Sequence, residues 1–212
     1  MSKQRKPDPR TQSTRAALID EAEILFARAG IDGVTTRQIG AATGSGNNNV
    51  VAYHFGDKDA LVVAIFQDRL ATIDRRRADL LQKIDAEDRG DEPLALLDCL
   101  CRPLLEQVDR NGHHSFAAFI DGVLKAGRIP LRATIADDYQ TTNTITDRLA
   151  KLCGSNHGDK NFVTRLHLAL AMIIATLQLI DREADSGVAR PETLFAQALA
   201  MMLAALQARS VT

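Results

Sequence analysis

At 212 residues, with 45% hydrophobic and 25% charged side chains, the chain is long and apolar enough to bury a sizeable core. A net charge of −1 excludes a protein that binds polyanions through its overall charge, and three cysteines (Cys99, Cys101 and Cys153) do not make a disulfide framework. The first apolar run begins only after Arg15, and the run 166–180 is short for a bilayer span. We therefore expect a cytoplasmic protein with no membrane partner.

Residues 1–12 have no periodicity and contain two prolines, which predicts a flexible arm. This N-terminal region is basic, because a single Asp8 stands among Lys3, Arg5, Lys6, Arg10 and Arg15. A basic arm ahead of a neutral body hints at a polyanionic partner. A disordered tail that only improves solubility is the alternative.

Three helices are predicted over residues 13–57. Apolar residues at helical spacing favour a first helix over 13–29, which Gly30 ends. Thr35 and Gln38 form a capping-box signature that predicts a short helix over 36–42. The stretch TGSGNNNVVAYHF then supplies a glycine-containing turn and a third helix ending near Phe55.

The remaining residues, 58–212, are predicted to form a larger helical domain. Asp57 is a plausible cap for a helix over 57–86, and Pro191 opens a last helix at a first-turn position. The intervening helices are expected at 93–109 (kinked at Pro103), 113–126, 129–152 and 159–185, with the last one at 191–207. No segment alternates with the period of a strand, so the predicted fold class is all-α.

The three short helices over 13–57 are typical of a helix-turn-helix unit, in which the third helix enters the major groove of DNA. Val51 and Phe55 are four residues apart and share a face that can be buried against Phe26, Ile39 and Ala42. The other faces of the third helix are then left for the partner.

Three consecutive asparagines precede this third helix. Asn47 is expected to cap it, while Asn48 and Asn49 are expected to project from its first turn. An Asn amide can pair bidentately with adenine, so these two side chains are candidate base readers. A merely polar turn is the alternative.

The segments LIDEAEILFARAG, VTTRQIGAATG and YHFGDKDAL resemble the DNA-binding domain of the tetracycline-repressor (TetR) family over residues 14–66. The resemblance implies that Thr35 and Thr36 lie near phosphates, and that Lys58 is the family's phosphate-contacting lysine. Arg37 is a further phosphate candidate, or else a solvated surface charge. The turn is one residue longer than the common pattern, and Ala52 replaces an aromatic residue. The candidate DNA-contacting residues are Thr35, Thr36, Arg37, Asn47, Asn48, Asn49, Ala52, Tyr53, His54 and Lys58.

The resemblance implies that the larger domain binds a ligand and forms a homodimer. Broad apolar faces on the last two helices suit an interface between two copies, with an ordinary core as the alternative. The interface candidates are Phe162, Leu166, Leu170, Ile173, Leu177, Leu199, Leu203 and Leu206. Few charges interrupt the central helices, which favours a mostly hydrophobic small molecule. The ligand candidates are His113, Phe116, Phe119, Tyr139, Asn143, His167 and Met172, and for most of them individually a core position is favoured over a ligand contact.

Two other classes of function receive little support from the sequence. Cys99 and Cys101 point about 200° apart on a helix, so they could not ligate one metal together with His113 and His114. No phosphate-binding loop or catalytic motif is present, so we expect no catalytic residue, no metal and no cofactor. The arginine run 75–77 is expected to be a solvated face.

The sequence therefore predicts a dimeric, ligand-responsive repressor of a roughly palindromic double-stranded DNA operator, with activation left open. A helical small-molecule enzyme or a metal-binding protein without DNA function is the alternative.

Overall fold

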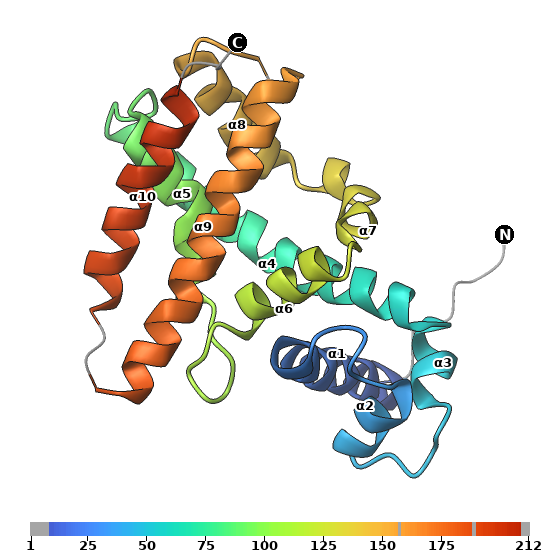
Figure 1. Ribbon diagram of the computed structural model, residues 1–212. Coiled ribbons are helices and arrows are strands. Elements are labelled where there is room, and N and C mark those ends of the chain that lie inside the picture. Colours follow the sequence, from blue (N-terminus) through green and yellow to red (C-terminus); the bar gives the residue numbers. More distant parts are fainter. Residues whose placement is uncertain (1–8, 157, 188–189, 209–212) are drawn as a thin grey trace, which may run out of the picture.

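The computed structural model describes residues 9–156, 158–187 and 190–208, in which all regular structure is helical (Figure 1). The predicted all-α class is confirmed. Residues 1–8, which include most of the predicted basic arm, lie outside the described residues.

The N-terminal helices form a head, defined here as α1 (Pro9–Ala29), α2 (Thr36–Ala42) and α3 (Val50–Phe55). Helix α1 begins at Pro9, so residues 9–12 are helical and not part of an arm. Proline is compatible with a first helical turn because the N–H that it lacks has no partner there.

Helix α4 (Lys58–Ala86) leads from the head into the body, which also contains α5 (Pro93–Glu106) and α6 (Ser115–Lys125). Asp57 caps α4 as predicted, because its carboxylate accepts from the Ala60 N–H at 2.7 Å. Helices α9 (Lys160–Asp185) and α10 (Pro191–Gln207) lie side by side at the far end of the body from the head (Figure 1).

The helix expected over 129–152 is instead three elements: α7 (Ile129–Ala133), the 3₁₀ turn η1 (Ala136–Asp138) and α8 (Gln140–Leu152). The Thr134 hydroxyl donates to the Leu131 carbonyl at 2.7 Å where α7 ends. The Asp74 carboxylate of α4 accepts from the Thr142 N–H at 2.8 Å and from its hydroxyl at 2.6 Å. A residue 68 positions away therefore caps the start of α8, which local sequence could not indicate.

One core runs from the head into the body. Phe26 of α1 stacks with Phe119 of α6 at 6.2 Å between ring centroids, and Phe66 of α4 lies 5.1 Å from Phe119. Buried residues of both parts form a single cluster. Movement of α6 or α4 is therefore felt directly at α1.

Most residues expected at a dimer interface are buried inside the single chain, so that assignment needs correction. The apolar stripes of α9 and α10 pack against each other and against α5 and α6. The buried candidates are Phe162, Leu166, Ile173, Leu177, Leu199 and Leu206, and Leu170 and Leu203 are partly buried. The helical period located the stripes correctly, but it did not say whether they face their own chain or another copy.

Among the described residues, α9 is the one helix whose length and composition would allow it to cross a membrane. Its stripe of Phe162, Ile173 and Leu177 is buried against the rest of the chain. The core helix of a soluble protein passes the same test of length and composition.

Candidate nucleic-acid interface

The start of α2 is fixed by the predicted capping box. The Thr35 hydroxyl accepts from the Gln38 N–H at 3.2 Å, and Gln38 Oε1 accepts from the Thr35 N–H at 2.8 Å. Thr35 and Arg37 are exposed and Thr36 is half-buried. Thr35 therefore caps α2 while its exposed side remains available to a partner.

The turn between α2 and α3 depends on two glycines. Gly44 has φ +73°, and the N–H groups of Gly44 and Ser45 donate to the carbonyls of Ala41 and Gly40, which is the Schellman arrangement. Gly40 itself is buried, and a Cβ placed there would lie only 2.9 Å from Val50 Cγ1. Helices α2 and α3 therefore cross at a distance that only glycine permits.

The asparagines lie in the last residues of this turn, before α3 and not within it. Asn47 Oδ1 accepts from the Asn49 N–H at 2.9 Å, so Asn47 shapes the entry to α3, which begins at Val50. Asn49 occupies the N-cap position without a side-chain cap hydrogen bond. All three asparagines are exposed, and within the described part of the chain the amides of Asn48 and Asn49 make no hydrogen bond. These two amides are therefore available to a partner.

Helix α3 has a buried and an exposed face. Val50 and Val51 pack into the core, whereas Ala52 is exposed and Tyr53 is 78% exposed. His54 is half-buried and lies edge-on to the Tyr53 ring at 5.0 Å. The exposed face thus continues the surface of the asparagine turn.

Phe55 carries a contact that the sequence did not suggest. The Arg15 guanidinium of α1 lies over its ring, 4.8 Å from the centroid. This cation–π contact ties the end of α3 to α1. The spacing of 40 residues leaves no local signal for it.

Lys58 is more engaged within the chain than the resemblance implied. Its Nζ donates to the carbonyls of Ile31 and Val34 at 3.0 and 2.9 Å, which fastens the loop between α1 and α2. An ammonium has three N–H donors, so one remains for a phosphate.

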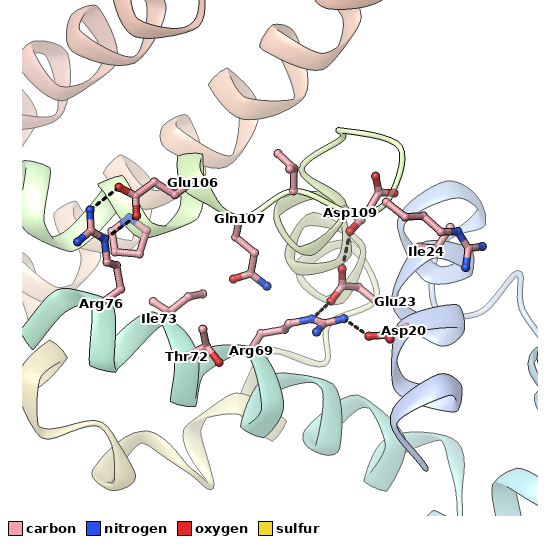
Figure 2. A pocket seen from close by; sticks show the side chains of 14 residues that line it. Asp20, Glu23, Ile24, Arg69, Thr72, Ile73, Arg76, Glu106, Gln107 and Asp109 are labelled. Atoms are coloured by element: carbon pink, nitrogen blue, oxygen red, sulfur yellow. Dashed lines mark hydrogen bonds and ion pairs between the residues drawn. The ribbon is translucent and has the colours of Figure 1, made fainter. Parts of the chain in front are cut away.

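The ligand candidates do not converge on one cavity. Phe116 and Phe119 are buried in the aromatic core. His113 Nε2 lies 3.4 Å from Asp185 Oδ1, and His167 is exposed. Met172 packs against the core and Asn143 is half-buried. Tyr139 lines a cavity of about 460 Å³. A cavity of about 620 Å³ lies instead between head and body, and Figure 2 shows its lining. Periodicity could not separate core positions from cavity walls.

The arginine run 75–77 is only partly solvated. Arg75 and Arg76 are exposed, but Arg77 is buried and donates to the Leu100 carbonyl at 2.6 Å and to the Thr142 hydroxyl at 2.8 Å. Burial lowers the pKa of Arg77 to about 10. Arg77 thereby joins α4 to α5 and α8.

The cysteines and histidines considered for a metal are engaged in other ways. Cys99 and Cys101 are buried, which raises the pKa of their thiols to about 11 and about 12. His114 forms hydrogen bonds through both ring nitrogens, Nδ1 with the Asp181 carboxylate and Nε2 with the Leu105 carbonyl. Across the described ranges, no group of three or more His, Cys, Asp or Glu residues is positioned to hold a metal ion.

Comparison with known proteins supports the interpretation of the head. Residues 18–65 match the sequence model of the family described as bacterial regulatory proteins, tetR family. No curated protein matches the chain as a relative. The matched residues include α2, the asparagine turn, α3 and the start of α4.

Proposed function

We propose that this chain, whose residues 18–65 match the tetR family of bacterial regulatory proteins, is a DNA-binding transcriptional regulator of that family and acts as a homodimeric repressor released by a small molecule. Members of this family are regulators rather than enzymes. The observation that carries the proposal is the continuous exposed surface formed by α2, the asparagine turn and α3.

Within this surface we assign two kinds of contact to DNA. Asn48 and Asn49 have unused amides at the entry of α3, and they read base edges in the major groove. Phosphates are contacted around them by Arg37, Tyr53 and the remaining N–H of Lys58, with support from Thr35, Thr36, Asn47, Ala52 and His54. Phosphate contacts give affinity, and base contacts give sequence preference.

A second copy would be held by the exposed sides of α9 and α10, which we call the outer face. Leu168 and Met201 are 68% and 59% exposed, and the same two helices carry exposed alanines. The alanines on this face are Ala171, Ala175, Ala200 and Ala204. Small residues let helices of two copies approach closely, and a two-fold dimer presents its two α3 helices to a roughly palindromic operator. Such a dimer acts in the cytoplasm, where its DNA is.

Selection of bound sequences from random double-stranded DNA tests the proposal. Enrichment of a two-fold symmetric motif is the expected result. Recovery of unenriched DNA would contradict sequence-specific regulation.

The asparagines give the sharper prediction. Asn48→Ala and Asn49→Ala should each lower the preference for the selected site over random DNA by about 1–3 kcal/mol, because a bidentate amide–adenine pair is lost. Titration of each variant against selected and random duplexes at one salt concentration measures this preference. Asn161→Ala, at an exposed asparagine far along the chain, is the matched control. Equal weakening on both duplexes would show that the amides do not read bases.

A further inference from the structure

The cavity of about 620 Å³ opens where head and body meet, between α1, α4 and the segment that joins α5 to α6. We call it the junction cavity. Its volume lies in the range that small organic ligands occupy in proteins. Because its walls come from both parts, an occupant would touch head and body together.

The charged walls of the junction cavity favour a cation. They contain four carboxylates (Asp20, Glu23, Glu106 and Asp109) and three guanidiniums (Arg69, Arg76 and Arg110). Carboxylates already hold each of these guanidiniums. An anionic ligand would therefore find no unpaired positive charge there. With four carboxylates against three guanidiniums, the lining carries an excess negative charge, which favours a cationic ligand.

The ion pairs of Arg69 join α4 to α1. The Arg69 guanidinium donates to Glu23 and to Asp20 at 2.6 Å each, and Figure 2 shows it reaching across from α4. Burial opposes the charge of Arg69, but the Glu23 and Asp20 carboxylates together outweigh it and raise the pKa of Arg69 above its ordinary value. This wall is thus pre-formed.

Gln107 supplies the polar group that lacks a partner. Figure 2 shows its side chain between the Arg76–Glu106 pair and the cluster of Arg69, Glu23 and Asp20. Its Oε1 is buried, and within the described ranges no hydrogen-bond donor reaches it. A buried acceptor without a donor is unfavourable, so a ligand N–H at this point would be bound well.

Apart from the hydroxyls of Thr72 and Ser115, the remaining lining is apolar. Ile24, Ile73 and Pro103 are buried in the walls, and Val108 is 50% exposed. A ligand that fills the cavity therefore needs a hydrocarbon part beside its donor group.

We propose that the junction cavity binds a small organic cation, a protonated primary amine on an apolar skeleton, whose ammonium group donates to Gln107 Oε1. The regulatory consequence rests on the proposed function: an amine that bridges α1 and α4 favours one orientation of the head and so changes operator affinity. This change equals the difference in its affinity for the two orientations.

The test uses 4-phenylbutylamine, with 4-phenylbutan-1-ol and 4-phenylbutanoate as matched neutral and anionic probes. Isothermal titration of each into the full chain without DNA should show the amine binding at least about tenfold more tightly than the other two. No amine binding at millimolar concentration, or equal binding of the alcohol or the acid, would overturn the proposal.

Two substitutions at Gln107 should move amine affinity in opposite directions. Gln107→Met keeps the shape but removes the acceptor, and should weaken the amine about tenfold. Gln107→Glu adds a carboxylate and should strengthen it, which a role in folding alone would not produce. Gln82→Met, at an exposed position of α4 outside the cavity, is the control. If both Gln107 variants bound the amine as tightly as the unchanged protein does, the amine site would not lie in the junction cavity.

Operator binding measured in parallel separates this proposal from the preceding one. A chain that selects DNA but binds no amine contradicts the junction cavity alone. A chain that binds the amine through Gln107 but selects no DNA contradicts the proposed function alone. Amine binding that leaves operator affinity unchanged would overturn the regulatory consequence.

Discussion

Lys58 shows how one side chain can serve the fold and the partner together. Its ammonium donates to the carbonyls of Ile31 and Val34, which belong to the loop between α1 and α2. The TetR resemblance assigned it only to phosphate. Its first role in the structure is to hold α2 in place relative to α4.

Lys58→Met should therefore lower the free energy of unfolding by about 1.5–3 kcal/mol, the range for a hydrogen bond to a charged group. If its third N–H contacts a phosphate, the slope of log affinity against log salt should also fall by about one. Urea denaturation and DNA titration at several salt concentrations measure the two effects. Lys83→Met, exposed near the end of α4, is the control. Unchanged stability would refute the structural role, and an unchanged slope the phosphate contact.

At the scale of elements, the α2–α3 pair depends on close approach. Gly40 lets α2 lie against Val50, and the Schellman turn at Gly44 then sends the chain into the asparagines. The crossing distance thus sets where the asparagine turn and α3 present their side chains.

Gly40→Ala should destabilise the head by about 1–3 kcal/mol, because the new Cβ would stand 2.9 Å from the stiff Val50 side chain. It should also weaken operator binding, since α3 must shift outwards. Thermal unfolding and operator titration check these effects. Gly46→Ala is the matched control, because no atom lies within 4 Å of a Cβ there. If Gly40→Ala left both thermal stability and operator affinity unchanged, the contact between α2 and α3 would not require a glycine at this position.

At the scale of the whole molecule, α9 and α10 each have an inner and an outer face. The inner stripes complete the core of one chain, and the outer face keeps Leu168, Met201 and the alanines exposed. A substitution on the inner stripe and one on the outer face should therefore fail in different ways.

Leu168→Glu or Met201→Glu should give a folded monomer, because a charge at the proposed dimer contact would have to be desolvated without a partner. Light scattering should show half the mass, and circular dichroism should remain helical. Operator affinity should fall, since the second half-site is no longer held nearby. By contrast, Leu177→Arg, at a fully buried position, should unfold the chain. Leu94→Glu, at an exposed leucine of α5, is the control. A Leu168→Glu protein that stays dimeric would place the interface elsewhere.

The sequence by itself determined the features that depend on near neighbours. The Thr35–Gln38 box, the Asp57 cap and the all-α class were readable because helical period and capping act within a few residues. The head was also recognisable, because its motifs recur with fixed local spacing over the matched residues 18–65.

Only the tertiary structure decided which face of each helix meets which neighbour. Asp74 caps α8 from α4, Lys58 reaches the loop before α2, and Arg77 turns inward from a run expected to be solvated. Gln107 became a candidate ligand contact because three distant segments enclose it. The helical period fixes the directions in which the side chains of one helix point. The packing of the helices decides which neighbour lies in each direction.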